Sequence, residues 1–408
     1  MEFTPIVRFA VMSDVHYQEK DSFQRERFKS AMEFVYNYSE NEEYKNLDAL
    51  YVVGDFTDLG KTEQFEMFAE DCKAYVKDST KLVPIIGGHE LQFVPDANVA
   101  LQDFKRVFDM DYDRHEVING YHFISLSTIK DKGPWSDSFD ITKREFLKTE
   151  LEKARKDGGN KPIFVFQHPG QVDTISGGFY GNSEIHSILS QYPQVIDFSG
   201  HSHCPVNDPR EIHQCNYTSV STGTLYYISL GIFKKYTNAR FDEYAYTDKE
   251  KPHMIKGCAH MLIVEVDGKG TVRIRKVDVV AGDFFENDYY IEDAYDISKH
   301  KYTQQRAKTA STPYFDIEAK VSIVRSENNI KVEFPGAHCE NERVFGYNVR
   351  IKSGDTVIAQ KGIVSDFMRL HQQDMYSTTF ENVCDDDISA EVYAFGFWDN
   401  YSKPIKSK

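Results

Sequence analysis

The ten residues KLVPIIGGHE, at positions 81–90, join a strand-like apolar run to an abruptly polar ending. The apolar run at 82–86 stops at two glycines, His89 and Glu90. Glycines next to a titratable side chain are typical of a loop where the backbone must approach another group closely. The stretch therefore predicts a buried strand that delivers His89 to a site shared with other parts of the chain.

Four more apolar runs end in the same way. They are short and rich in Val, Ile, Leu and Phe, as expected of strands covered on both faces. The runs at 7–12, 47–53, 163–166 and 195–198 are followed by Asp14 and His16, by Asp55 and Asp58, by His168, and by His201 and His203. Ligands of open α/β sheets bind at the carboxyl ends of the strands, so these polar residues are candidate site residues.

Helical patterns separate the apolar runs. One starts near Asp21 or Ser22, and others fit 62–75, 142–156 and 183–191. Alternation of strand and helix predicts an α/β layer fold. Two hairpin patterns, one around Asn119-Gly120 and one around 267–270, add antiparallel strands, so mixed sheets are expected.

The C-terminal part of the chain has a different pattern. We expect a first domain at 1–301, a polar linker at 302–313, and a second domain at 314–408. The last segment holds short alternating strands bounded by turn residues. This spacing predicts a small all-β sandwich of the immunoglobulin or fibronectin type III kind.

The polar residues at the strand ends have the chemistry of metal ligands. In an extended chain, residues two apart lie on one side, so the pairs in DVH at 14–16 and HSH at 201–203 are each expected to face one cavity. Carboxylate oxygens and imidazole nitrogens suit Mn, Fe or Zn. Two such ions about 3.5–4 Å apart clamp a phosphoryl group and activate a bridging water.

Charge and hydropathy narrow the function classes. The 408-residue chain has a formal net charge of −16, which disfavours polymeric nucleic acid as a partner. A small anionic substrate fits if metal cations reverse the local field. No apolar run of about 18 residues is present, so no membrane partner is expected. The N-terminus does not resemble a secretory signal, which favours the cytoplasm unless a leader has been removed.

Six widely spaced cysteines form no CxxC pair. They are expected to be ordinary thiols, with Cys339 and Cys384 able to pair if the compartment is oxidising. Cys204 directly follows His203 and is expected to be a buried thiol rather than a ligand.

Taken together, the motifs resemble those of the calcineurin-like metallophosphoesterase superfamily. The pattern of that superfamily is DxH, GDxxD, GNH(D/E), H and GHxH. The corresponding motifs here are DVH at 14–16, GDFTD at 54–58, GGHE at 87–90, His168, and GHSH at 200–203. The resemblance runs from residue 9 to 203, with continuation to about residue 300. It implies a four-layer α/β/β/α sandwich with a dinuclear metal centre.

The resemblance also implies roles for single residues. One metal would be held by Asp14, His16, Asp55 and His203, and the second by Asp55, His168 and His201, with Asp55 bridging. His89 would face the substrate and assist the leaving oxygen, and Asp58 would orient a ligand or His89.

Gly88 departs from the family pattern, which places a metal-ligating Asn there. Three interpretations stay open at this stage. Water or Glu90 completes the second metal's coordination, or the second metal binds weakly and turnover is low or absent, or the residue was replaced deliberately to trap a ligand. Glycine has no side chain with which to bind a metal, so some loss of metal affinity is expected.

Two glycine-containing loops lie near the predicted site. Trp135, Phe179 and Tyr180 can stack on a nucleobase, although loop packing is the more ordinary role of such residues. Asn182 can bond substrate or cap the helix that begins at 183. Tyr180 and Asn182 are therefore candidate substrate contacts.

The sequence thus predicts a metal-dependent phosphoesterase that hydrolyses a P–O bond of a small phosphodiester or phosphomonoester. Protein phosphatase activity is disfavoured, because the arginine that usually follows GDxxD in that branch is replaced by Leu59 and Gly60. The alternative is a weakened or inactive phosphoester-binding protein whose C-terminal sandwich contacts another protein. Measured turnover with added Mn²⁺ separates the two.

Overall fold

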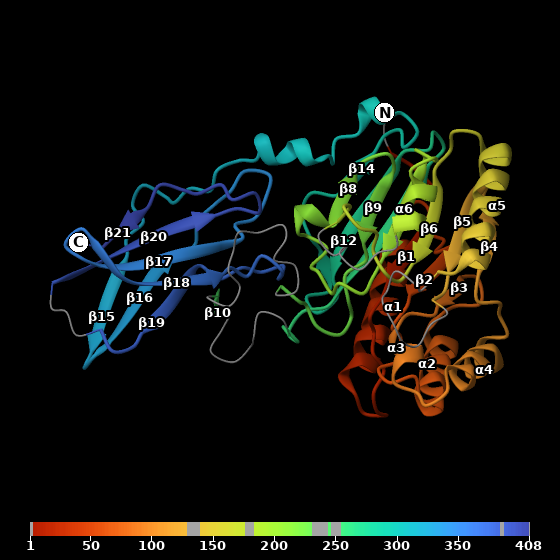
Figure 1. Cartoon of the computed structure of the whole chain (residues 1–408), viewed down its shortest axis with the longest axis horizontal. Helices are drawn as coiled ribbons and strands as arrows, with labels where there is room; N and C mark the ends of the chain where they lie inside the picture. The colour runs from red at the N-terminus through yellow and green to blue at the C-terminus, as the bar shows by residue number, and fades with distance from the viewer. Residues whose placement is uncertain are drawn as a thin grey trace. The chain divides into compact units, whose positions relative to one another are not determined.

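The computed structural model describes residues 3–128, 139–175, 183–230, 244–245, 254–383 and 387–407. It divides into two compact units (Figure 1). The first unit contains residues 1–228 and 256–304, and the second contains residues 229–255 and 305–408. The expected domain boundaries at 301 and 314 stay a prediction.

Two mixed sheets form the centre of the first unit. The seven-stranded sheet has the order β13-β12-β11-β1-β2-β3, with β14 paired to β12, and the six-stranded sheet has the order β4-β5-β6-β7-β9-β8. Strands of the first sheet are β1 (Pro5–Met12), β2 (Ala49–Val53), β3 (Lys81–Ile85), β11 (His260–Asp267), β12 (Val272–Asp278), β13 (Asp283–Phe284) and β14 (Tyr289–Ile291). Strands of the second are β4 (Arg114–Ile118), β5 (Tyr121–Leu126), β6 (Ile163–Gln167), β7 (Val195–Ser199), β8 (Ile212–Gln214) and β9 (Thr218–Ser221).

Helices cover the outer face of each sheet. Apolar side chains of α1 (Phe23–Asn41), α2 (Thr62–Tyr75) and α4 (Ala97–Phe108) pack with those of the seven-stranded sheet in one core cluster. Those of α5 (Ile141–Gly158) and α6 (Ser183–Leu189) pack with the six-stranded sheet in another. Figure 1 shows the α5 ribbon alongside β4 and β5 of that sheet. The first unit is therefore the expected α/β/β/α sandwich.

Aromatic side chains fill the space between the two sheets. The ring of Phe9 on β1 makes edge contacts with Phe123 on β5 and Phe164 on β6, at centroid distances of 5.2 and 5.0 Å. Tyr51 on β2 stacks on Phe166 at 3.8 Å. These strands are buried on both faces, which is why they are apolar without alternation.

The structure also shows where the sequence interpretation of single elements was incomplete. Helix α4 was not predicted, although Asp96 accepts a hydrogen bond from the backbone nitrogen of Asn98 and caps it. Ser22 stands at the N-cap of α1 but makes no side-chain capping bond. The Asn119-Gly120 turn between β4 and β5 has φ of 50° and 77°, the left-handed conformation that this dipeptide favours.

The second unit consists of β-sheets that are antiparallel except for the pairing of β10 with β18. The five-stranded sheet has the order β10-β18-β17-β20-β21 and the three-stranded sheet the order β15-β16-β19. Their strands are β10 (Tyr244–Ala245), β15 (Ser322–Ser326), β16 (Asn329–Pro335), β17 (Gly346–Ser353), β18 (Thr356–Val364), β19 (Met375–Phe380), β20 (Ile388–Phe395) and β21 (Ile405–Lys406). Side chains from both sheets share one core, so the all-β prediction is confirmed.

Two further expectations concern single features. Two short 3-10 helices span Ile297–Lys299 and Gln304–Lys308. The second of them lies within the expected linker at 302–313. Cys339 is a free thiol, and Cys384 lies outside the described residues, so their pairing stays a prediction. Among the described residues, no helix combines the length and apolar character needed to cross a membrane.

Candidate metal centre

Five loops, one after each predicted strand end, meet at one place in the first unit. The backbone nitrogen of Asp14 donates to the carbonyl oxygen of Gly54 at 3.0 Å, and that of His16 donates to the carbonyl of Asp55 at 3.0 Å. These bonds join the loops after β1 and β2, whose strands are neighbours in the seven-stranded sheet. On the six-stranded sheet, the backbone nitrogen of Gly200 donates to the carbonyl oxygen of His168 at 3.0 Å, which joins the loops after β7 and β6.

The i, i+2 spacing predicts extended backbone for the paired candidate ligands, but the structure shows another conformation. The left-handed region is occupied by Asp14, His16, Asp55, His201 and His203, with φ of 51°, 54°, 52°, 70° and 54°. Left-handed backbone is unfavourable for residues with a side chain, and it concentrates at functional sites. The convergence was expected, but alternation along a strand is the wrong reason for it: strained loops aim these side chains.

The first group of candidate ligands consists of Asp14, His16 and His203. The Nε2 atoms of the two histidines lie 3.3 Å apart, and Nε2 of His203 lies 3.2 Å from Oδ1 of Asp14. Oδ2 of Asp14 faces away, accepting bonds from the hydroxyl of Ser13 and the backbone nitrogen of His201. Oδ1 therefore remains directed at the imidazoles.

The second group consists of Asp55, His168 and His201. Nε2 of His168 lies 2.9 Å from Oδ2 of Asp55, and both side chains are almost fully buried. Asp55 belongs as well to a third group with His16 and His89. Asp55 thus lies where the groups meet, which is the position that the family resemblance gives to a bridging carboxylate.

His89 lies beside the first group, and Asp58 contacts both His89 and His16. The His89 side chain is 30% exposed, more than those of His16, His168 and His203, and its Nε2 lies 4.0 Å from Oδ2 of Asp55. Its Nδ1 donates to the backbone carbonyl of Asp58 at 2.7 Å. The Asp58 carboxylate lies 3.3 Å from Nδ1 of His16. One residue therefore orients both rings.

Backbone carbonyls orient two further candidate ligands. Nδ1 of His168 donates to the carbonyl of Val53 at 2.8 Å, and Nδ1 of His203 donates to that of Tyr227 at 3.0 Å. A ring whose Nδ1 carries the proton presents an unprotonated Nε2 in its neutral form. This is the arrangement that metal-ligating histidines adopt in proteins.

The donor set fits a transition-metal ion. Two adjacent ligand atoms bound to one ion at about 2.0–2.1 Å lie about 2.8–3.4 Å apart, from octahedral to tetrahedral geometry. The spacings of 3.3 and 3.2 Å in the first group agree with that range. Oδ1 of Asp14 is also buried without a hydrogen bond of normal geometry, which is costly unless a cation compensates it.

Charge in the centre favours positive ions. Burial acts to raise the pKa of Asp14, but the nearby His203 and His16 outweigh it and hold that pKa well below its ordinary value. Burial likewise acts to lower the pKa of His168, but Asp55 and Asp14 raise it to about 10. For His201, burial and the neighbouring His168 lower the pKa to about 3, which keeps its imidazole neutral and able to ligate.

The two glycines before His89 differ in whether the structure requires glycine at their position. A Cβ on Gly87 would collide with Oδ1 of Asp55 and lie 2.6 Å from its backbone nitrogen, so only glycine fits. Gly88 is the N-cap of α3 (His89–Gln92) and has φ −78° and ψ −43°, which any residue adopts. The backbone conformation at position 88 therefore does not require glycine.

Glu90 does not turn toward the candidate ions. Its carboxylate accepts hydrogen bonds from the backbone nitrogens of Asp55, Gly87 and Thr57 at 3.0, 2.8 and 2.8 Å, and from the Thr57 hydroxyl at 3.0 Å. Burial and Asp55 raise the pKa of Glu90 to about 7, against the effect of those backbone donors. Glu90 thus fastens the loops, and the interpretation that it replaces the missing ligand is wrong.

Several residues of the site were not predicted from the sequence. Nε2 of Gln18 donates to Oδ2 of Asp58 at 3.1 Å and to the Tyr226 hydroxyl at 3.0 Å. The ring of Tyr227 packs on His203 at a centroid distance of 4.2 Å. Tyr226 and Tyr227 follow no apolar run and match no motif, so only the presence of two adjacent tyrosines marks them in the sequence.

Other sequence predictions fall outside this geometry. Cys204 is a buried thiol outside any disulfide, as expected. Outside the described residues lie Trp135, Phe179, Tyr180 and Asn182, so the substrate roles suggested for them stay predictions.

A family profile described as calcineurin-like phosphoesterase matches residues 7–205, the segment that contains all the candidate ligands. Residues 7–205 belong to the calcineurin-like phosphoesterase family. In this phosphoesterase domain the ligand groups arise from the five loops after β1, β2, β3, β6 and β7. A search of curated proteins found no matching relative.

Solved structures similar to the chain share little sequence with it. Purple acid phosphatase PPD1 from yellow lupin (Lupinus luteus) seeds is 15% identical with a TM-score of 0.48, over 72% of this chain and 55% of that one. The chain thus spans about half the length of that phosphatase. A protein of unknown function from Aquifex aeolicus, AQ665, is 16% identical with a TM-score of 0.20, over 45% and 93% of the two chains. The protein N2152 from Neocallimastix frontalis is 8% identical with a TM-score of 0.22, over 96% and 100%.

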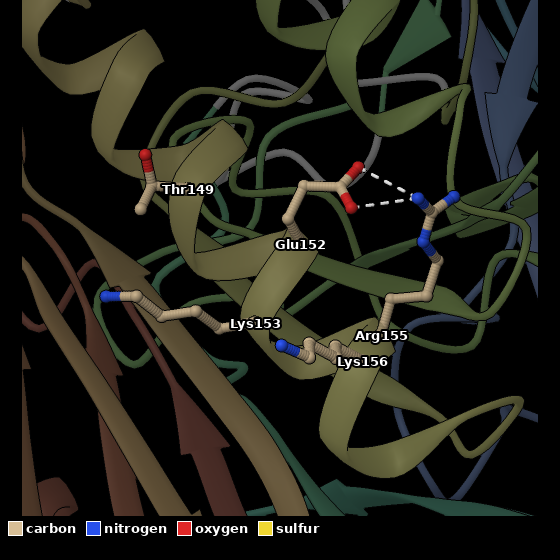
Figure 2. Close-up of a pocket in the computed structure, with 5 residues that line it drawn as sticks. All are labelled: Thr149, Glu152, Lys153, Arg155 and Lys156. Carbon is tan, nitrogen blue, oxygen red and sulfur yellow. Dashed lines mark hydrogen bonds and ion pairs between the residues drawn. The ribbon is translucent and has the colours of Figure 1, made fainter.

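A surface hollow of the phosphoesterase domain lies away from these ligands. Figure 2 shows its five lining side chains, all from α5: Thr149, Glu152, Lys153, Arg155 and Lys156. Glu152 and Arg155 are paired there at 2.8 Å, and both are about half exposed. None of the candidate metal ligands lines this hollow, which is the solvent side of one helix.

Proposed function

We propose that the chain is a metal-dependent phosphoesterase that hydrolyses a P–O bond of a small phosphodiester or phosphomonoester. The observation that supports this most strongly is the presence of two ligand groups, one of Asp14, His16 and His203 and one of Asp55, His168 and His201. A third group of His16, Asp55 and His89 connects them, because it shares His16 with the first and Asp55 with the second. Two ions of Mn, Fe or Zn fit this donor set. When bound, they supply positive charge to the phosphoryl oxygens and lower the pKa of a coordinated water.

The chain's own residues then have distinct tasks. Asp14 and Asp55 place negative charge where the ions bind, and the carbonyls of Val53 and Tyr227 hold the Nε2 atoms of His168 and His203 toward them. His89 donates its Nδ1 proton to the carbonyl of Asp58, so its Nε2 faces the site as the atom that gains or loses the second proton. In its imidazolium form, His89 stabilises the oxygen that leaves phosphorus.

Gly88 supports a second candidate function. It offers no ligand atom, and Glu90 is committed to the loop backbone, so the second group holds only Asp55, His168 and His201 among the described residues. A protein with a weakly held second ion would bind phosphoesters with little turnover. Its second unit would then be the natural place for contact with a protein partner.

Turnover and metal content of the full chain test the proposal. The protein is stripped of metal, reloaded with Mn²⁺, Fe²⁺ or Zn²⁺, and assayed with bis(p-nitrophenyl) phosphate and p-nitrophenyl phosphate. We expect close to two ions per chain, hydrolysis of at least one substrate, and a melting temperature that rises with metal because the ions bind only the folded state. His203→Ala is expected to lose an ion and most of the activity.

A matched control is Tyr295→Leu, an exposed side chain of the same unit that contacts no candidate ligand in any described interaction. Stoichiometric metal binding with phosphate binding but no hydrolysis would favour the binding protein. Failure to take up any ion would contradict both candidate functions.

A further inference from the structure

Five aromatic side chains form a continuous arc of ring contacts through the candidate metal centre. His16 contacts His89 at a centroid distance of 4.4 Å, and His89 contacts Phe93 at 4.8 Å. From His16 the contacts also run to Tyr226 at 5.2 Å and from Tyr226 to Phe23 at 5.8 Å. Phe23, Phe93 and Tyr226 are here called the aromatic rim.

The outer members of the rim are open to solvent. Phe93 is 53% exposed and Phe23 is 39% exposed, while Tyr226 is partly buried. A single exposed apolar side chain is ordinary on a protein surface. Two that connect to the same metal-ligand candidate through one intervening ring each make a localised apolar surface beside a strongly polar centre, which is typical of a binding site.

The rim is held in place by specific contacts. The guanidinium of Arg27 donates to the backbone carbonyls of Leu225 and Tyr226 and lies 4.5 Å from the centre of the Phe23 ring. Gln18 connects the Tyr226 hydroxyl to Asp58. A single arginine thus positions two of the three rim residues, and the third, Phe93, is fixed by the short helix that begins at His89.

The position of Phe93 relates the rim to the reaction. Phe93 contacts the ring of His89, the residue that faces the leaving oxygen in the proposed function. A planar group carried by that oxygen would therefore come to lie against Phe93. Aromatic faces favour offset or edge contacts with a planar ring at 4.5–7 Å, and flexible alkyl groups gain less from such a surface.

We propose that the aromatic rim binds a planar aromatic group, a nucleobase or an aryl ring, carried by the phosphoester substrate. The inference rests on the proposed function for the place of the phosphoryl group. It defines the substrate class further: nucleotide-like or aryl phosphoesters are preferred over esters of alkyl alcohols. Tyr226 and Phe93 are specificity-determining residues, and Arg27 is a positioning residue.

Binding of phosphonates tests the rim without needing turnover, because a P–C bond is not hydrolysed. Dissociation constants of phenylphosphonate, cyclohexylphosphonate and ethylphosphonate are measured by calorimetry with the Mn²⁺-loaded full chain. We expect phenylphosphonate to bind about tenfold more tightly than ethylphosphonate and several-fold more tightly than cyclohexylphosphonate. The cyclohexyl compound has similar size and no π-face, so it separates stacking from plain apolar burial.

Variants then locate the effect. Phe93→Leu and Phe23→Leu keep apolar volume at exposed positions, and each is expected to reduce the phenyl preference to threefold or less while leaving ethylphosphonate binding within twofold. Tyr295→Leu, an exposed position outside the rim, is expected to keep the full preference. Arg27→Lys is expected to weaken the preference without changing metal content.

Three outcomes would overturn the proposal: equal affinity for phenyl and ethyl compounds, an unchanged preference in both phenylalanine variants, or no binding of either phosphonate. Its failure is distinct from failure of the proposed function. Hydrolysis without a ring preference would support the phosphoesterase function and contradict the binding role of the aromatic rim. A ring preference without hydrolysis would support the role of the rim and contradict the phosphoesterase function.

Discussion

The carboxylate of Glu90 accepts a hydrogen bond from the backbone nitrogen of Asp55 at 3.0 Å, inside a fully buried environment. Through further bonds to Gly87 and Thr57 it connects the loop after β3 with the loop after β2. The Glu90 side chain therefore shapes the centre without being directed into it.

Glu90→Gln tests this connection. The amide keeps one acceptor oxygen but turns an NH₂ group either toward the backbone nitrogen of Thr57 or toward those of Asp55 and Gly87. Each unsatisfied buried group costs about 1–3 kcal/mol. We expect a loss of about 2–4 kcal/mol in the free energy of unfolding and a lower affinity for metal. Urea denaturation and metal titration measure the two effects. Glu152→Gln, at a carboxylate that is about half exposed, is the control, and equal stability of both variants would contradict the role given to Glu90.

Alanine substitutions at the paired glycines are expected to differ strongly. In Gly87→Ala the new Cβ would meet the backbone nitrogen of Asp55 at 2.6 Å and Cγ of His168 at 2.9 Å, so the loops must move apart. In Gly88→Ala the helical backbone accepts a side chain. We expect Gly87→Ala to lose metal and several degrees of melting temperature, and Gly88→Ala to keep both. Similar behaviour of the two proteins would show that close packing at Gly87 is not required.

Gly88→Asn is expected to restore a ligand to the second group. Its backbone conformation suits asparagine, whose amide oxygen would add a direct bond to an ion otherwise held by Asp55, His168 and His201. We expect higher occupancy of the second ion, measured by mass spectrometry of metal content, and hydrolysis raised about tenfold or more. Gly88→Ala distinguishes ligation from stiffening of the loop. Unchanged metal content in Gly88→Asn would mean that the chain tolerates the vacancy.

Asp197 on β7 is expected to make stability depend on pH. It is fully buried with one hydrogen bond, from Gln167 at 2.8 Å, and burial raises its pKa to about 7. The folded state therefore retains a proton that the unfolded chain loses near pH 4, and stability falls as pH rises from about 4 to 7. The loss is at most about 4 kcal/mol for a shift of about three units.

Asp197→Asn removes this titration. Urea denaturation at pH 5 and pH 8 is expected to show a smaller decrease for the variant than for the parent protein, with the variant more stable at pH 8. Asp111→Asn, at a carboxylate that is 86% exposed, serves as the control and is expected to follow the parent. If the pH dependence of Asp197→Asn equals that of the parent, the buried carboxyl does not hold a proton.

Much of the candidate site was predictable because its motifs are local. Each apolar run with its Asp or His ending lies within about ten residues, and parallel strands of one sheet end at the same edge. The lack of a ligand at Gly88 was equally predictable from the sequence, since it depends only on the identity of one residue. The hairpin at Asn119-Gly120 follows from the backbone preference of that dipeptide.

The tertiary structure decided what no local pattern contains. Asp14 and His203 are separated by almost two hundred residues, and their 3.2 Å approach depends on how two sheets pack through aromatic side chains such as Phe9. The rim that connects Phe23 with Tyr226, and the turning of Glu90 toward the backbone of Asp55, arise from the same packing. Sequence by itself determined which residues end the strands; only packing between distant segments determined which of them touch, because side-chain contacts depend on three-dimensional position rather than on periodicity.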